Sequence, residues 1–336
     1  MKICVRNNMY EHLLQLDDVR LNFGNNGGLV LSIVQAFVMF GVALGIKPLH
    51  FKTAFSHPKA VLTGFVSQVV LLPAVTFAGV YLCGSYLTVP VALGAIMVAC
   101  CPGGNISNFI SSISRGNVEL SVSLSAISTV TAVVITPLNF SFWGNLYIAH
   151  SEYVRELEIP ISQVFHTLFF IIGVPLILGI LFSTKFPSLT KKISGPIQKI
   201  SVGIFMLMVL VAFATNFAYF CRYIKYILLI VFVHNGIAFV TGYCAAWGAG
   251  LNMRDRRTIS IETGIQNSGL ALMLIFNPAI FPPEIKTGGM AYMAAWWGVW
   301  HIISGLTLSA AWNFGRRLRY VKLTKKRAER NVDKIQ

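Results

Sequence analysis

Long apolar runs separated by short polar segments form the dominant pattern along this chain. A nearly uncharged run of about 20 residues has the length at which an α-helix crosses ~30 Å of hydrocarbon. Such runs lie near residues 28–46, 60–83, 88–114, 120–143, 160–183, 200–220, 226–250, 258–281 and 287–313. The pattern therefore predicts an all-α polytopic membrane protein with nine transmembrane helices.

Composition agrees with lipid surroundings. Of the 336 residues, 55% are hydrophobic and 12% are charged, and the mean hydropathy is +0.67. The first 27 residues are too polar to cross and lack the pattern of a cleavable signal peptide, so the first span is expected to target the chain. We expect a polar extracytoplasmic segment over 1–27, a transporter domain over 28–313 and a basic cytoplasmic tail over 314–336.

The distribution of lysine and arginine predicts the orientation. Alternate connecting segments, 47–59, 115–119, 184–199, 251–257 and the tail from 314, hold 20 of the 27 basic residues, and the remaining segments hold seven. Basic residues stay cytoplasmic, so we expect the N-terminus outside and the C-terminus inside a plasma or inner membrane. The cations flank apolar spans, so the bilayer and not nucleic acid is the expected partner of the +15 charge. No obligate protein partner is evident.

The third run is interrupted at its centre. It reads VALGAIMVACCPGGNISNFISSIS, in which Pro102–Gly104 are followed by Asn105, Ser107 and Asn108. Proline removes a backbone donor and glycine disfavours helix, so the helix is predicted to break there.

The eighth run, which contains ISIETGIQNSGL, repeats this arrangement. Gly264 and Gly269 lie among Glu262 and the polar stretch 266–268. Spans three and eight are five crossings apart, so structural equivalence makes them inverted repeats; pairing 1/6, 2/7, 3/8 and 4/9 leaves span five unpaired. Two matched breaks are typical of the binding site of a secondary transporter.

Glu262 needs a partner, because an ionised carboxylate in hydrocarbon costs at least ~2.5 to 3.5 kcal/mol. No lysine or arginine lies centrally in a span, which leaves His166, His234, His301, a proton or a metal ion.

The fourth run offers hydroxyl oxygens at Ser121, Ser125 and Ser128, which fall on one helical face. Oxygen-rich surroundings favour a hard cation, and sodium fits better than calcium, which prefers more carboxylates.

These segments resemble the bile acid:sodium symporter family. The likeness covers the nine spans nearly continuously, through IKPLHFKTAFSHPK, SQVVLLP, CCPGGNISNFISSISRGNVELSVSLSAISTV, VFVHNGIAF, IETGIQNSGLA and VWHIISG. It implies a core domain, approximately 60–143 and 226–313, in which the two broken helices cross near the midplane. A panel domain, approximately 28–46 and 160–220, moves against it and is one helix short of ten-helix relatives.

The resemblance also implies ligands for two sodium ions. The first ion is expected at Ser107, Asn108, Ser121, Ser125 and Glu262. The second is expected at Gln68, Glu262, Gln266 and the main-chain carbonyls of Thr263 and Ile265. Substrate-binding residues are expected at Asn105, Asn267 and His301. Ile302 replaces an amide that bacterial bile-acid binders carry in WHNISG, which leaves the substrate open.

We therefore expect a symporter that imports an organic anion, bile-acid-like or another carboxylate or sulfate, by alternating access. Sodium ions, two in number, serve as coupling ions and no cofactor is needed. Two sodium ions and one carboxylate sum to +1, which a monovalent anion neutralises. The alternative is a proton-coupled carrier or antiporter in which Glu262 titrates. A vestigial transporter acting as a receptor is a further alternative. An enzyme is not expected, because HExxH and GxSxG are absent.

Overall fold

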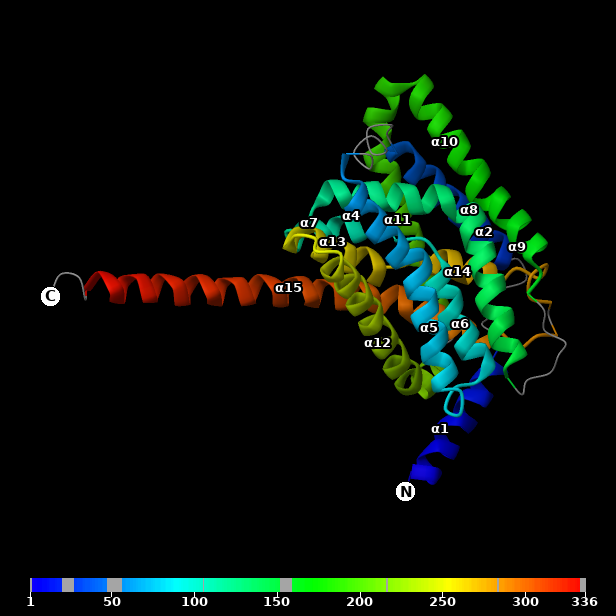
Figure 1. Ribbon diagram of the computed structural model, residues 1–336. Coiled ribbons are helices and arrows are strands. Elements are labelled where there is room, and N and C mark those ends of the chain that lie inside the picture. The colour runs from blue at the N-terminus through cyan, green and yellow to red at the C-terminus, as the bar shows by residue number, and fades with distance from the viewer. Residues whose placement is uncertain are drawn as a thin grey trace.

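The computed structural model describes residues 2–19, 27–46, 56–104, 106–151, 159–215, 217–282 and 284–332. Within them the regular elements are helices (Figure 1), as the sequence predicts. Their order is α1 (Lys2–Asp17), α2 (Gly27–Gly45), α4 (Pro58–Val66), η1 (Ser67–Leu71), α5 (Leu72–Leu82), α6 (Val89–Cys100), α7 (Ile106–Ile113), α8 (Val118–Ala149), α9 (Ile161–Leu168), η2 (Phe169–Gly173), α10 (Val174–Lys185), α11 (Pro187–Thr215), α12 (Phe217–Gly248), α13 (Met253–Gly264), α14 (Ser268–Ile275) and α15 (Gly288–Val332).

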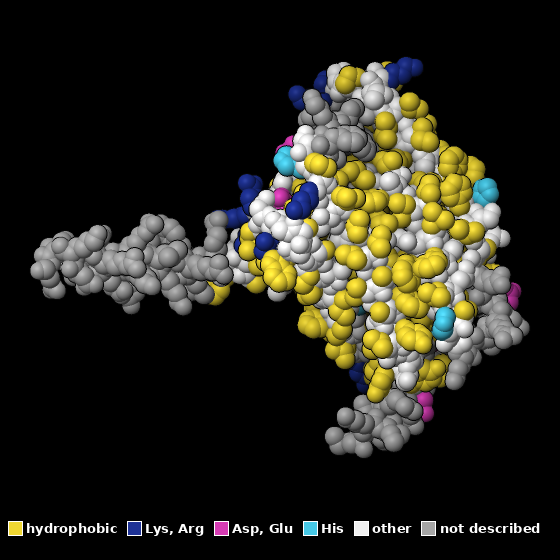
Figure 2. Space-filling view, in the orientation of Figure 1, with side chains coloured by type: hydrophobic (Ala, Val, Ile, Leu, Met, Phe, Trp, Pro, Cys, Tyr) yellow, Lys and Arg dark blue, Asp and Glu magenta, His cyan; other side chains and the backbone are white. Residues whose placement is uncertain are grey.

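Each predicted apolar run falls on a helix or on consecutive helices. Four of the described stretches are long and apolar enough to cross a membrane by length and composition: Pro58–Leu82, Val118–Ala149, Ile161–Lys185 and Cys221–Gly248. Hydrophobic side chains cover the central part of the face seen in Figure 2, whereas lysines and arginines gather toward its edges. Exposed Leu62, Phe142 and Leu178 contribute to the apolar surface. The chain is thus an integral membrane protein.

Both predicted breaks are present. α6 ends at Cys100 and α7 begins at Ile106, while α13 ends at Gly264 and α14 begins at Ser268. The third and eighth runs are therefore each two half-length helices joined by extended backbone.

The helices pack in two groups. α2 lies against α10 and α11, which also contact each other. α5, α6, α8, α12, α13, α14 and α15 pack together around the two breaks. α2 touches α14, and α8 touches α9 and η2, so these contacts join the groups.

Two wide π-turns interrupt apolar helices, and the sequence analysis did not predict them. In both cases a proline follows, Pro73 after η1 and Pro175 after η2. Proline has no N–H and its ring crowds the carbonyl four residues earlier. For Pro73 that carbonyl belongs to Val69, and it accepts a hydrogen bond of 2.7 Å from Asn139 Nδ2 instead. The bulge thus ties the second run to α8.

The polar N-terminal segment contains a docked helix that the hydrophobic pattern did not predict. Leu13 and Leu16 of α1 are fully buried. His12 stacks on Tyr226 of α12, with ring centroids 5.0 Å apart. Lys286 forms an ion pair of 2.6 Å with Asp18. These partners come from segments that the charge pattern assigns to the same side as the N-terminus.

The expected boundary between the last span and the tail lies within one helix. α15 continues without a break from Gly288 to Val332 and runs out of the bundle (Figure 1).

Asp17 is the most deeply placed polar group of α1. Its side chain is 3% exposed, and Oδ1 has no hydrogen-bond partner among the described residues. A β-carbon at Gly289 would collide with that oxygen, so glycine is required there. Burial raises the pKa of the Asp17 carboxyl to about 7, although Thr88 and Lys286 lower it in part. Between about pH 4 and pH 7, the Asp17 carboxyl therefore stays protonated when α1 is docked and is ionised when the segment is free.

Acidification should strengthen the docking of α1. Because the docked carboxyl has the raised pKa, the stability of docking is full below about pH 4 and declines as the pH rises toward about 7. We expect Asp17→Asn to slow hydrogen exchange of the α1 amides by about tenfold or more at pH 8, and to lose this advantage near pH 4. Glu11→Gln, on the exposed face of the same helix, is the control. Equal protection of variant and parent at every pH would contradict this.

Candidate functional site

The two helix breaks cross in direct backbone contact. Gly104 N–H donates to Ile265 O at 2.9 Å, and Asn267 N–H donates to Pro102 O at 2.8 Å. The crossing is an antiparallel bridge. A β-carbon on Gly104 would lie 3.1 Å from the carbonyl oxygen of residue 266. Glycine thus permits the two extended strands to approach and satisfy each other's backbone groups.

Glu262 lies at the crossing and is completely buried. Ser107 Oγ donates to its Oε1 at 2.6 Å, and Ser121 Oγ also donates to Oε1. Ser125 Oγ donates to Oε2 at 3.1 Å. Three hydroxyls from two helices therefore hold one carboxylate.

The remaining member of the first expected sodium site also lies here. Asn108 Oδ1 accepts a hydrogen bond of 3.4 Å from Ser125. Ser128, which shares the serine face of α8, instead donates to the carbonyl of Ser125 at 3.2 Å. The structure brings together all five residues expected for this site, and Ser128 lies outside it.

The C-terminal end of α13 holds carbonyls that no further helical turn can satisfy. Gln68 Nε2, from η1, donates to Glu262 O at 2.7 Å. Gln266 Nε2 donates to Thr263 O at 2.8 Å. Side-chain amides thus occupy the first two of these carbonyls.

The next two carbonyls are satisfied in the same way. Asn235 Nδ2, from α12, donates to Gly264 O at 2.7 Å, and Gly104 N–H donates to Ile265 O. Four consecutive carbonyls, those of the last three residues of α13 and of Ile265 directly after it, therefore each receive one amide donor. Three of the donors are side chains and one is the backbone of the opposite break.

Two oxygens of this cluster remain without a hydrogen-bond partner among the described residues: Gln68 Oε1 and Gln266 Oε1. Both side chains are at least 98% buried. Buried amide oxygens without donors are rare and call for a cation or water. With Glu262 and the serine hydroxyls they form an oxygen-rich ligand set of the kind that hard cations prefer. The residues expected for the second sodium site therefore fit an ion, once the amides turn their oxygens toward it.

No described cation side chain forms an ion pair with Glu262. Histidine was one of the counter-charges left open by the sequence, but no hydrogen bond joins a described histidine to this carboxylate. His234 Nε2 instead pairs with Thr76 Oγ1 at 2.8 Å, and His166 is exposed. Among the described residues, the side chains that donate hydrogen bonds to the carboxylate oxygens are neutral serines.

The expected substrate residues are less closely grouped. Asn105 lies outside the described residues. Asn267 is half-buried, and its Oδ1 caps α14 by accepting from Leu270 N–H at 3.1 Å. His301 is buried and its Nδ1 has no described hydrogen-bond partner. Ile302 is half-buried.

Three residues near the break were missed by the sequence analysis as site members. Ser67 Oγ pairs with Thr263 Oγ1 at 3.0 Å. Asn235 holds Gly264 O, and Ser304 Oγ donates to Asn235 Oδ1 at 2.5 Å. The dipeptide His-Asn inside an apolar run was the available signal, because a buried asparagine needs partners for both ends of its amide.

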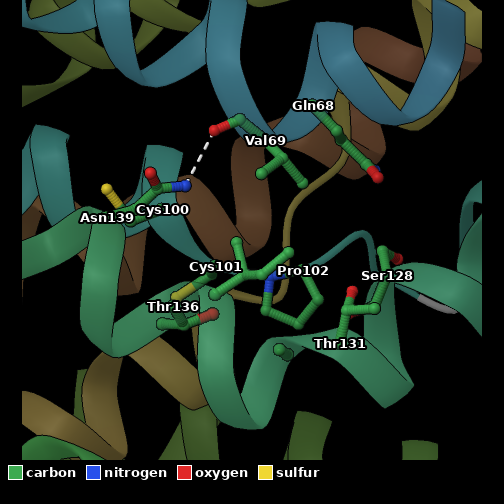
Figure 3. Close-up of a pocket in the computed structure, with 11 residues that line it drawn as sticks. Gln68, Val69, Cys100, Cys101, Pro102, Ser128, Thr131, Thr136 and Asn139 are labelled. Carbon is green, nitrogen blue, oxygen red and sulfur yellow. Dashed lines mark hydrogen bonds between the residues drawn. The ribbon is translucent and has the colours of Figure 1, made fainter. Parts of the chain in front are cut away.

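A pocket adjoins the site between η1, the end of α6 and α8 (Figure 3). The pocket is small and partly open to the surroundings, with room for about one water molecule. Gln68, Pro102, Ser128, Thr131 and Thr136 contribute polar and backbone groups to its wall. Gln68 thus lines the pocket with a side chain that also contacts the main chain at Glu262.

Comparison with known proteins identifies the family. The model of the sodium bile acid symporter family matches residues 32–222. The chain is 30% identical, over 84% of its length and 83% of the relative, to an uncharacterized sodium-dependent transporter, YocS, of Bacillus subtilis. It is 32% identical, over 70% of its length, to the probable chloroplastic sodium/metabolite cotransporter BASS1 of Arabidopsis thaliana. It is 29% identical, over 76% of its length, to the P3 protein of Homo sapiens.

The chain spans little more than half the length of the plant and human relatives, 56% and 52% respectively. The fold and the comparisons define a membrane transporter and not an enzyme. The chain belongs to the sodium bile acid symporter family.

Gly103 gives the site a sharp test. A β-carbon there would lie 2.6 Å from Gln68 Nε2 and 3.2 Å from Glu262 Oε2. Gly103→Ala should therefore displace Gln68 from Glu262 O. We expect the sodium concentration at half-maximal thermal stabilisation to rise about tenfold. Gly79→Ala, where the added carbon meets nothing within 4 Å, is the matched control. Thermal unfolding in sodium chloride against choline chloride measures the midpoint, and identical midpoints for both variants would refute the contact.

Proposed function

We propose that this protein is a sodium-coupled symporter that imports an organic anion by alternating access. The observation that carries the proposal is the buried Glu262 carboxylate, which accepts hydrogen bonds from three serine hydroxyls. Nearby, the side-chain oxygens of Gln68 and Gln266 have no hydrogen-bond partner among the described residues. The names of two relatives, a sodium-dependent transporter and a sodium/metabolite cotransporter, support sodium as the coupling ion.

Two sodium ions are assigned to two adjacent ligand sets. The first ion is held by Ser107, Asn108, Ser121, Ser125 and Glu262. The serine hydroxyls donate to the carboxylate, so their lone pairs stay available to the ion. The second is held by Gln68, Gln266, Glu262 and the carbonyls of Thr263 and Ile265. Glu262 is shared, so each ion lowers the electrostatic cost of keeping that carboxylate ionised in the membrane.

The helix ends at the crossing attract charges of opposite sign: C-terminal ends favour cations and N-terminal ends favour anions. The carbonyl end of α13 is the negative end of its dipole and favours cations. α7 and α14 start at the crossing with their positive N-terminal ends, beside Asn105 and Asn267. An anionic substrate is assigned to these ends and to His301, so recognition needs no buried arginine.

The two packed groups of helices supply the moving parts. The group of α2, α10 and α11 is assigned as the panel, and the helices around the crossing as the core. We assign all nine apolar runs as membrane spans, with the N-terminus outside and the C-terminus in the cytoplasm of a plasma or inner membrane. Two sodium ions with Glu262 carry +1, so a monovalent anion makes the loaded core nearly neutral.

Removing the Glu262 charge tests the coupling role. Glu262→Gln should abolish the increase in melting temperature that sodium chloride gives over choline chloride, because the amide no longer attracts the cations. Glu119→Gln, an exposed carboxylate at the start of α8, should leave that increase unchanged. Survival of the sodium effect in Glu262→Gln at the parent's midpoint would contradict the assignment.

Proton coupling is the rival for the same carboxylate, since Glu262 could titrate instead of binding sodium. Reconstituted vesicles loaded with an inward gradient of sodium or choline, at a fixed pH gradient, separate the two. Accumulation of radiolabelled anions from a panel of bile acids, steroid sulfates and small carboxylates should require sodium. Accumulation driven equally well in choline would favour the proton carrier.

A further inference from the structure

We propose that Asn235 and Ser304 are positioning residues of the sodium site: they fix the last carbonyl of α13 and thereby the carbonyls on either side of it that bind the ion. This inference rests on the proposed sodium site and adds two residues, from α12 and α15, that belong to neither expected ligand set.

The four carbonyls that receive amide donors, those of residues 262–265, are not equivalent. Those of Glu262 and Thr263 are held by Gln68 and Gln266, whose own oxygens have no described partner. These glutamines can rotate and become ligands. The Gly264 carbonyl is held by Asn235, and it lies between the two main-chain ligands of the second site, Thr263 and Ile265.

Asn235 differs from the glutamines because both ends of its amide are engaged. Nδ2 donates to Gly264 O at 2.7 Å, while Oδ1 accepts from Ser304 Oγ at 2.5 Å. The side chain is completely buried. Since only the NH₂ group can donate to a carbonyl, this pairing fixes the amide orientation. Asn235 is therefore locked in place and acts on the ion through the backbone that it holds.

Ser304 connects this lock to the helix that lies along the break. On the same helix, a β-carbon at Gly298 would lie 2.6 Å from Ser268 Oγ, and one at Gly305 would lie 3.3 Å from the side chain of Ile265. α15 is thus seated against both sides of the α13–α14 break. A shift of α15 is transmitted through Ser304 and Asn235 to the carbonyl of Gly264.

Loss of a positioning residue should lower the affinity for sodium by a measurable factor. A binding constellation must be held within about 0.5 Å of its productive geometry, and loss of a supporting hydrogen bond around a metal ligand typically costs 10 to 100-fold in affinity. Asn235→Leu keeps the approximate volume of the side chain but removes the donor to Gly264. We expect the sodium concentration at half-maximal thermal stabilisation to rise about tenfold or more.

The matched control is Asn145→Leu. Asn145 of α8 also uses both ends of its amide, toward the backbone of Ile159, but far along the helix from the serines of the site. It should lower the melting temperature in choline chloride and leave the sodium midpoint unchanged. Ionic strength is held constant in all comparisons.

A milder pair keeps the test decisive if Asn235→Leu does not fold. Ser304→Ala should raise the sodium midpoint and change the ratio of sodium to lithium stabilisation, whereas Ser304→Thr, which keeps the hydroxyl, should restore both. Ser309→Ala, at a buried serine of the same helix, is its control.

The outcomes separate the two proposals. A parent chain with no sodium-dependent stabilisation overturns the proposed function, and this inference falls with it. A parent with normal sodium dependence, together with Asn235→Leu and Ser304→Ala that only lower the melting temperature in choline chloride, overturns the positioning role alone.

Discussion

α13 ends inside the packed interior of the protein, where its last carbonyl oxygens have neither water nor a further helical turn to satisfy them, and a carboxylate is buried beside them. Each unsatisfied group costs several kcal/mol in hydrocarbon, so the surrounding protein must supply the partners. The four amide donors at the end of α13 and the serine hydroxyls at Glu262 meet this demand. In the proposed function, a sodium ion takes the place of some of these hydrogen-bond donors, and the site can then alternate between an empty and a loaded state.

The scaffold around the crossing follows from that demand. Gly103 and Gly104 allow the two breaks to touch, and the missing N–H of Pro73 goes with a wide turn that includes Gln68. Asn139 satisfies the carbonyl freed by that proline and so fixes the turn against α8. Glycine and proline weaken an isolated helix. Here they lie next to the positions where side-chain and backbone amides are needed as hydrogen-bond donors.

Membership of the sodium bile acid symporter family explains the site more directly than it explains the cargo. The carboxylate, serines and glutamines are proposed to bind the ion, whereas the residues expected from the resemblance to face the substrate include the alkyl side chain of Ile302. An apolar surface there favours contact with the hydrocarbon part of an anion over its polar groups. α15 carries both Ile302 and Ser304, and Ser304 donates a hydrogen bond to Asn235.

The sequence by itself determined the helical class, the nine apolar runs, both breaks and the polar residues within them, because periodicity, proline and glycine act locally. It also indicated, through resemblance, the five residues expected at a first sodium site, which the structure brings together. Only the tertiary structure decided that α1 docks as a helix, since its buried face of Leu13 and Leu16 is too short to stand out by hydropathy. Only the tertiary structure showed that Asn235 bonds to Gly264, 29 positions away, and to Ser304, 69 positions away. Hydrogen bonds over such separations produce no periodic pattern in the sequence.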